Sequence, residues 1–437
     1  MKKNRKNLLK ILGLGFLSIL LIACGANDTT NDGDGTGETA DIRFSWWGNS
    51  DRHEATLEAI NIYEDNNPDV TVEGEYSGFG DIEERITTQV SGGTEPDLTT
   101  ILYSMVSQYS PEGERFVNLE DYSDIIDLSQ YDEQFLEFGY IDDSLQALPY
   151  GENSLVVALN KSVFDELGVE IPDTWEGYKE IAQEFPEDSY PLVSPTTRFA
   201  ATVYLQQKTG MTEFDDEGNM NYTEEDYLDA MTWYLDLVDA GVFASRQSYL
   251  ENVGSDPESI AQNPKFIEGE YAGVLEWSGG LQSYAATLEE EGQELVLAPF
   301  PTIEDAVTEG SISKPSLLFA VSPNSTYPEA TIEFMEFLVN DPEGVRAMGL
   351  TRGVPASEKA IEILEEDGQL EGIHGEVIEY TNNLETLNQT PFYEDASLTN
   401  LYQTQLERVE LGQASVEEAA AQVYTQTQQI AENLASE

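Results

Sequence analysis

The chain has 437 residues, and its 84 acidic residues against 20 basic ones give a formal net charge of −64 at pH 7. A surface this acidic repels nucleic acid and anionic lipid, so the charge excludes both as partners of the general surface. Only two histidines and one cysteine occur, which excludes metal sites built from histidine and cysteine ligands.

The first 24 residues have the layout of a bacterial export signal. A basic head spans residues 2–10, and the apolar run Leu8–Ile22 is shorter than the roughly 20 apolar residues of a membrane-spanning helix. The run ends in Leu21-Ile22-Ala23-Cys24, which resembles the bacterial lipobox. The resemblance implies that residues 1–23 are a cleaved signal peptide. It also implies that Cys24 carries lipid such as palmitate, anchoring the protein at the outer face of the cell membrane. The alternative is an ordinary amino-terminal membrane anchor with an incidental cysteine.

Residues 24–40 follow as a short polar segment. They include several glycines and no large apolar side chain, which predicts a flexible tether below the folded body. Cleavage removes five of the basic residues, so 15 basic and 84 acidic residues remain, with a net charge of −69. Because Cys24 is the only cysteine, the lipidated protein contains no disulfide, and packing must supply its stability.

The folded body is expected to begin with a strand, a helix and a second strand. Apolar residues alternate along Asp41–Trp47, recur at helical spacing along His53–Asn66, and a strand is again predicted at Val70–Tyr76. The further predicted elements, in chain order, are a helix at Ile82–Val90, a strand at Pro96–Leu102, an extended segment at Leu145–Asn160, helices at Lys161–Leu167 and Thr174–Phe185, a hairpin turn at Asp215–Asn219, a helix at Glu224–Ala240, a strand at Ala272–Glu276, and helices at Pro328–Val339 and Val416–Leu434. The repeated alternation of strands and helices predicts an α/β fold.

Motifs of known catalytic centres are scarce in this sequence. It contains no GxSxG and no HExxH motif. Paired carboxylates of the glycosidase type stay open, because 84 acidic residues place some pairs close together by chance.

Aromatic residues beside turns are the more informative feature. They occur in Trp46-Trp47-Gly48, Tyr76-Ser77-Gly78-Phe79, Tyr150-Gly151 and Trp277-Ser278-Gly279. Sugars pack their flat C–H faces on aromatic rings and need polar partners around the edge. Core packing is the commoner role of any one such ring, and Trp46, Trp175 and Trp233 are expected in the core. Trp47 would face the opposite side of its strand.

Six segments carry a resemblance to a known family. They are FSWWGNSDRHEATLEAI, VEGEYSGFGDIEERI, GGTEPD, ALPYGENSLVVALNKSVFDELGV, GVLEW and LTRGVPAS, in this order. Together they resemble the solute-binding lipoproteins of ATP-driven (ABC) carbohydrate importers, extracellular solute-binding family 1. Within that family, the WWGxxxRH opening, Lys314-Pro315-Ser316 and Arg352-Gly353-Val354-Pro355 look most like members that bind pectin fragments such as rhamnogalacturonan oligosaccharides.

The resemblance implies a two-lobed periplasmic-binding-protein fold of type II with a ligand cleft between the lobes. Residues 41–150 plus about 315–350 would form one lobe, and residues 151–314 plus about 351–437 the other. It also implies a monomer outside the cytoplasm that captures an oligosaccharide and delivers it to ABC permease subunits, without enzymatic activity, cofactor, metal or nucleic acid.

Site residues follow from the same resemblance. The expected ligand-binding residues are Trp47, Asn49, Arg52, Ser77, Phe79, Asp97 and Tyr103 on one side, and Tyr150, Asn153, Trp277, Lys314 and Arg352 on the other. Stacking is assigned to Trp47, Phe79 and Trp277, and hydroxyl binding to Asn49, Asp97 and Asn153. If the ligand is a uronate, Arg52, Lys314 and Arg352 would neutralise it. The family often has tryptophan where Phe79 stands, so the preferred sugar can differ.

Each cation also has an alternative role. Arg52 would then bridge nearby acidic residues, Lys314 would belong to the hinge, and Arg352 would pair with Glu358. For the whole chain, the alternatives are a surface enzyme that cuts polysaccharide with two carboxylates, and a receptor for another solute such as a polyol, a phosphodiester or a peptide.

The net charge also predicts a stability that depends on salt. Self-repulsion weakens as the Debye length falls from about 10 Å at 0.1 M salt to about 3 Å at 1 M, which suits a halophilic or alkaliphilic source with an acidic proteome. We therefore expect the melting temperature, followed by circular dichroism, to rise between low and molar sodium chloride. A midpoint that does not rise would contradict this.

Overall fold

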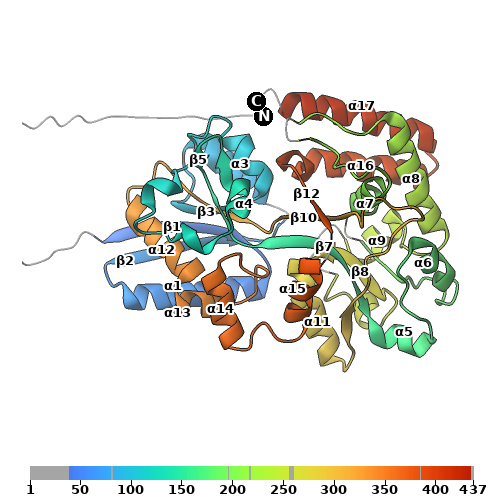
Figure 1. Ribbon diagram of the computed structural model, residues 1–437, viewed down its shortest axis with the longest axis horizontal. Coiled ribbons are helices and arrows are strands. Elements are labelled where there is room, and N and C mark those ends of the chain that lie inside the picture. Colours follow the sequence, from blue (N-terminus) through green and yellow to red (C-terminus); the bar gives the residue numbers. More distant parts are fainter. Residues whose placement is uncertain are drawn as a thin grey trace, which may run out of the picture. The chain divides into compact units, whose positions relative to one another are not determined.

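The structure is a computed structural model that describes residues 39–79, 82–194, 196–215, 218–254, 260–383 and 385–434. The predicted signal peptide, Cys24 and nearly all of the predicted tether lie outside these residues. Within them, no helix is long and apolar enough to cross a membrane. The described residues form two lobes, each built on its own sheet (Figure 1).

Lobe 1 contains a five-stranded sheet in the order β2-β1-β3-β11-β6. Its strands are β1 (Ala40–Trp47), β2 (Val70–Ser77), β3 (Leu98–Ile101), β6 (Leu148–Pro149) and β11 (Leu318–Val321). β1 pairs in parallel with β2 and β3, whereas β11 runs antiparallel to β3 and β6. Ile42, Phe44 and Trp46 alternate along β1 and are at most 1% exposed, which places one face of this strand in the core.

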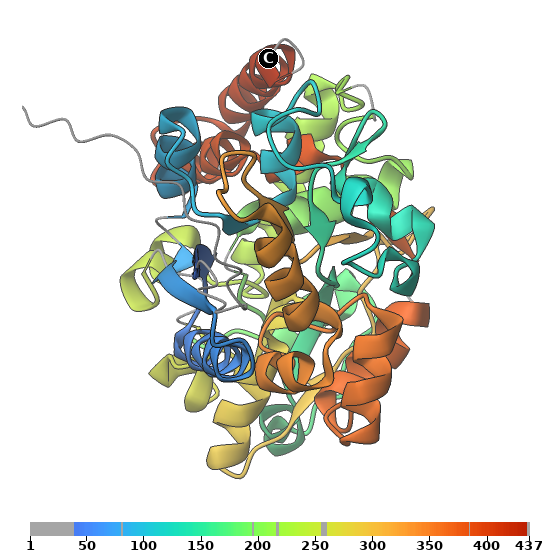
Figure 2. The same ribbon diagram turned by 90° about the vertical axis from the view of Figure 1, so that its left-hand side faces the viewer.

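Helices cover the sheet of lobe 1. α1 (Ser50–Asn66) packs against α13 (Pro342–Met348), which in turn contacts α12 (Pro328–Asn340). Figure 2 shows the blue α1 beside the orange helices of this group. The remaining elements of this part of the chain are α2 (Ile82–Gly92), α3 (Tyr103–Tyr109), α4 (Glu133–Leu136), β4 (Tyr140–Ile141) and β5 (Ser144–Leu145).

Lobe 2 contains the second sheet, in the order β12-β10-β7-β8, with β9 also paired to β7. Its strands are β7 (Glu152–Asn160), β8 (Gly273–Trp277), β9 (Leu295–Leu297), β10 (Ser311–Pro315) and β12 (Thr386–Asn388). Residues 154–160 of β7 are buried, as expected for a central strand covered on both faces.

The helices of lobe 2 surround this sheet, and α17 packs on α8 and α16. In chain order they are α5 (Lys161–Leu167), α6 (Trp175–Ala182), α7 (Thr197–Thr209), α8 (Glu224–Asp239), α9 (Arg246–Asn252), α10 (Pro264–Ile267), α11 (Leu281–Glu290), α15 (Ile373–Asn383), α16 (Ala396–Glu410) and α17 (Val416–Leu434).

Most of the predicted elements are confirmed with small shifts of their ends. The predicted helix 53–66 starts three residues earlier, because the Asn49 side chain accepts a hydrogen bond from the Arg52 N–H and caps it. The predicted turn 215–219 joins an antiparallel bridge between Phe214 and Met220, although residues 216 and 217 lie outside the described part. Trp46 and Trp175 are buried, whereas Trp233 is half-buried and stacks on Tyr204.

Two adjacent segments cross between the lobes. One joins β6 to β7 through Tyr150 and Gly151, and the other joins β10 to β11 through residues 316–317. The Ser316 N–H donates to the Gly151 carbonyl at 2.6 Å, and the Tyr150 N–H donates to the Leu317 carbonyl at 2.9 Å. Figure 1 shows β7 running from one lobe into the other. These paired segments form the hinge.

A third segment, residues 351–356, lies against this hinge. The Ala356 N–H donates to the Tyr150 carbonyl at 2.8 Å, and Gly151 forms an antiparallel bridge with Pro355. The sequence placed residues from about 351 in the second lobe, but α14 (Glu358–Glu366) packs on α13 and α12. Buried apolar residues of α14, including Leu364, join Val345 of α13 in one small cluster, so the chain returns to lobe 2 only after α14.

The hinge predicts a strong effect of one added methyl group. A Cβ at Gly151 would lie 2.2 Å from the Val354 carbonyl oxygen, so Gly151→Ala must push residues 351–356 away from the crossing strand. We expect a loss of about 1–3 kcal/mol in the free energy of unfolding, seen as a lower melting temperature. Gly78→Ala is the matched control, because no atom lies within 4 Å of its Cβ. Equal midpoints of the two variants would contradict this account.

Candidate ligand-binding cleft

A cavity of about 760 Å³ lies between residues of both lobes. Its walls include Trp47, Asn49, Arg52 and Phe79 from lobe 1, Phe199, Trp277, Ser283 and Tyr393 from lobe 2, Asn153 and Lys314 from the hinge strands, and Arg352 from the third segment. Eight of the twelve predicted ligand residues therefore line one cavity in the described part of the chain: Trp47, Asn49, Arg52, Phe79, Asn153, Trp277, Lys314 and Arg352.

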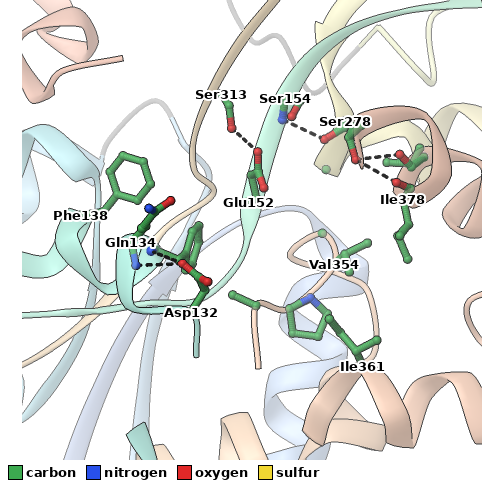
Figure 3. A pocket seen from close by; sticks show the side chains of 17 residues that line it. Asp132, Gln134, Phe138, Glu152, Ser154, Ser278, Ser313, Val354, Ile361 and Ile378 are labelled. Atoms are coloured by element: carbon green, nitrogen blue, oxygen red, sulfur yellow. Dashed lines mark hydrogen bonds between the residues drawn. The ribbon is translucent and has the colours of Figure 1, made fainter. Parts of the chain in front are cut away.

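The hinge strands separate this cleft from a second cavity. In the antiparallel pair β7 and β10, Asn153 lies opposite Lys314 and Ser154 lies opposite Ser313. Because side chains alternate across a strand, Asn153 and Lys314 line the cleft, whereas Ser154 and Ser313 line a pocket of about 380 Å³ behind the hinge. Figure 3 shows this back pocket, with Ser313 beside Glu152.

The back pocket lacks the charge that the cleft carries. No lysine or arginine lines it within the described residues, and its two carboxylates have local partners. The Asp132 carboxylate caps α4 by accepting the Gln134 N–H at 2.8 Å, and Glu152 accepts a hydrogen bond from the Ser313 hydroxyl. The cleft is lined by three cations and several aromatic rings, and also by the carboxylates of Asp51, Glu276 and Glu371. Because it combines cations with aromatic rings, we identify the cleft as the candidate site.

Two arginines form the cationic end of the cleft. Arg352 is 1% exposed, and its guanidinium donates to Thr56 Oγ1 at 2.8 Å. The expected alternative, a pair with Glu358, does not form, and no carboxylate among the described residues pairs with Arg352. Burial, followed by the positive charge of Arg52, lowers the pKa of Arg352 to about 9. Its Nε is buried without a hydrogen-bond partner.

Arg52 is held in place by backbone carbonyls. Its Nε donates to the Thr351 carbonyl at 2.9 Å, and one terminal nitrogen donates to the Trp47 carbonyl at 3.3 Å. Nearby, Trp46 Nε1–H donates to His53 Nδ1 at 3.1 Å. Burial, together with the charges of Arg52 and Arg352, lowers the pKa of His53. Burial and the two neighbouring guanidinium groups therefore both oppose a positive charge on His53.

Aromatic rings line the rest of the cleft. Trp47 and Phe79 meet edge to face at 6.2 Å between ring centroids, and Trp277 and Phe199 do the same at 5.2 Å. The Lys314 ammonium lies 4.8 Å from the centroid of the Trp277 ring, a cation–π contact. Phe79 is 38% exposed, so its ring remains accessible for stacking.

Four predicted residues lie outside the residues that line the cleft. The Asp97 carboxylate accepts the Arg43 N–H at 2.9 Å and the Ser325 hydroxyl at 2.6 Å, so it joins β1 to the loop after β11. Tyr103 packs edge to face on Phe138. The Ser77 hydroxyl donates to the adjacent Gly78 carbonyl. Tyr150 is buried in the hinge, where its ring packs edge to face on Phe319 of the lobe 1 core.

Most of the other residues that line the cleft were not predicted from the sequence, and three of them illustrate why. Phe199 lies on α7, Ser283 on α11, and Tyr393 in the 3₁₀ turn Pro391–Glu394. None is next to a predicted strand end or a glycine turn of the kind that marked Trp47 or Trp277. The one sequence signal for Tyr393 was its aromatic character, which 22 tyrosines make uninformative.

Comparisons with known proteins agree with this architecture. Residues 58–371 match the family profile described as bacterial extracellular solute-binding protein. A periplasmic solute-binding protein from Pectobacterium atrosepticum is 30% identical with a TM-score of 0.84, and the match covers 90% of this chain and 99% of that one. A periplasmic oligogalacturonide-binding protein from Yersinia enterocolitica, in complex with saturated digalacturonic acid, is 27% identical with a TM-score of 0.85 at the same coverages.

A curated relative matches over a shorter stretch. The erythritol/L-threitol-binding protein of Mycolicibacterium smegmatis is 23% identical over 261 residues, which are 50% of this chain. The chain spans about half the length of that relative, 52%. The profile match over most of the chain, together with the two-lobed fold and its cleft, identifies this chain as a member of the bacterial extracellular solute-binding proteins.

Proposed function

We propose that the protein is the substrate-binding lipoprotein of an ABC carbohydrate importer, and that it captures oligosaccharides containing uronate residues. It is non-catalytic and works outside the cytoplasm, where an extracellular family operates. The lipid on Cys24 and the tether would keep it near its permease subunits while the body closes on sugar as a monomer.

The buried guanidinium of Arg352 is the observation that carries the uronate assignment. In a chain with a net charge of −64, a buried cation without a carboxylate partner among the described residues is costly. Its Nε–H lacks an acceptor, and Arg52 lies beside it. A planar carboxylate from a ligand supplies both the missing charge and the missing acceptor.

The aromatic walls support a sugar as the carrier of that carboxylate. Trp47, Phe79, Phe199 and Trp277 present rings to the cleft, and polar side chains such as Asn400 and Gln282 line its remaining wall. The Yersinia relative, which was solved with saturated digalacturonic acid, has a similar fold over 99% of its length. The polyol named for the mycobacterial relative is a weaker candidate, because a four-carbon chain fills little of a cavity of about 760 Å³.

A ligand screen tests the proposal directly. Thermal shifts should be measured for the purified protein with galacturonate oligosaccharides, rhamnogalacturonan fragments, neutral oligosaccharides of equal length, and erythritol. Binding to the native state raises the midpoint, so we expect the acidic saccharides to raise it most. Chromatography of the same mixtures should show no product. Turnover would favour the surface enzyme, and a response to erythritol alone would favour a polyol receptor.

Arg352 should carry much of the preference for acidic sugars. Arg352→Met removes the charge at similar volume, so we expect uronate affinity to fall at least tenfold, about the effect of one hydrogen bond to a charged group. Neutral-sugar affinity should change little, and the melting temperature without ligand should not fall, because a buried cation has been removed. Arg346→Met, at a surface pair with Asp367, is the matched control. Unchanged uronate affinity in calorimetry would rule out this role.

Trp277 should contribute by stacking. Trp277→Ala removes the ring that Lys314 and Phe199 contact. Because stacking of a sugar on such a ring contributes about 1–3 kcal/mol to binding, we expect the affinity for any bound saccharide to fall by about an order of magnitude. Trp233→Ala, in the same lobe but outside the cleft residues, serves as the control. Calorimetry that gives equal affinities for Trp277→Ala and the wild type would remove Trp277 from the site.

A further inference from the structure

A hydrogen bond joins two described residues of opposite lobes across the cleft. The Asn49 side-chain amide donates to Ser283 Oγ at 3.4 Å. Asn49 lies in lobe 1 at the start of α1, and Ser283 lies in lobe 2 in the first turn of α11. Both residues line the cleft and both are half-buried. The sequence analysis assigned Asn49 to sugar hydroxyls, but its amide donor is already directed at the opposite lobe.

The orientation of the Asn49 amide is fixed by the helix that it caps. Its Oδ1 accepts the Arg52 N–H at 3.1 Å, so the oxygen faces the helix and the NH₂ group must face away from it. The Arg52 guanidinium also donates hydrogen bonds to the backbone carbonyls of Thr351 and Trp47. These hydrogen bonds therefore fix the position of the Asn49 amide donor within the cationic end of the cleft.

Ser283 is positioned equally firmly, from the hinge. Asn153 Oδ1 accepts the Gly279 N–H at 2.7 Å and the Ser278 hydroxyl at 3.2 Å, and Ser278 Oγ in turn accepts the Ser154 N–H at 3.1 Å. These bonds tie the turn before α11 to the crossing strand β7. Asn153 was also assigned to sugar hydroxyls. Its Oδ1 instead accepts hydrogen bonds from the turn that precedes the helix of Ser283.

We propose that Asn49 and Ser283 form a latch that closes the cleft over a bound saccharide, with Asn153 as its positioning residue. The latch rests on the proposed function and deepens it, because Asn49 and Ser283 would stabilise the closed cleft without having to contact the sugar. It forms when the lobes are together and must break before they separate. Its loss should therefore speed ligand release and leave capture unchanged.

The test is a double-mutant cycle on ligand affinity and release. Ser283→Ala removes the acceptor, and Asn49→Ser removes the amide but keeps a side chain that caps a helix well. We expect each single variant to raise Kd roughly three- to tenfold, the range for one net hydrogen bond. The change should lie in koff, measured by stopped-flow fluorescence, and the double variant should be no weaker than the worse single one.

Two further variants separate a latch from general damage. Ser283→Thr keeps a hydroxyl and should retain wild-type release, whereas Thr287→Ala removes a hydroxyl one turn further along α11, outside the cleft residues, and should change nothing. Additive effects of Asn49→Ser and Ser283→Ala would overturn the latch, because they would mean that each side chain contacts the sugar independently. A slower kon with unchanged koff would overturn it as well.

Failure of the proposed function gives a different result. If the wild type binds no saccharide in the screen, that proposal fails, and small-angle scattering without ligand then decides on the latch. Ser283→Ala should show a larger radius of gyration than the wild type and Ser283→Thr, because loss of the bond favours separated lobes. Equal radii would overturn the latch.

Discussion

The antiparallel register of β7 and β10 is the constraint on which the cleft depends. Because Asn153 lies opposite Lys314, and Ser154 opposite Ser313, one face of the hinge strands carries the cation and the amide while the other carries hydroxyls. A slip of one residue would exchange the two faces and move Lys314 away from Trp277. Two lobes with separate cores can thus present a single binding surface, since the crossing strands orient both.

The net charge of the protein and the charge of the arginine-lined end of the cleft have opposite signs. The body is strongly acidic, whereas Arg52, Arg352 and Lys314 meet in one cavity. An acidic sugar is repelled at long range and attracted only within a few ångströms. Salt weakens the long-range repulsion more than the attraction inside the cleft, because exposed charges are screened more than buried ones. The acidic surface and the uronate preference are therefore compatible in a saline medium, and the surface discourages anions that cannot fit the cleft.

The sequence predicted the parts of the fold that local patterns determine. β1, β2 and α5 agree closely with their predicted ranges, because alternation or helical spacing of apolar residues is clear there. α7 was missed because it is buried on several sides and includes the buried polar residues Arg198 and Gln207. A helix surrounded by protein lacks the one-sided apolar stripe that identifies a surface helix.

The site was predictable where it follows strand ends, and less so elsewhere. Trp47 is the last residue of β1, and Phe79 follows β2. The carboxyl ends of these two strands lie at the same edge of the sheet, which is where α/β folds bind ligands. Ser283 and Tyr393 reach the cleft only through tertiary packing. Asp97 illustrates the opposite case, because the family resemblance assigned it to a ligand, whereas it directly precedes β3 and its carboxylate joins two parts of lobe 1.

Asn49 and Asn153 show why residue type alone does not reveal a role. Both are polar, both line the cleft, and both satisfy protein groups. A receptor that delivers its ligand must close firmly enough to retain it and weakly enough to open again. One net hydrogen bond contributes about 0.5–1.5 kcal/mol, which shifts the open and closed populations by roughly three- to tenfold without trapping either. A bond of this strength across the cleft, between residues tied to α1 on one side and to the hinge on the other, meets both requirements.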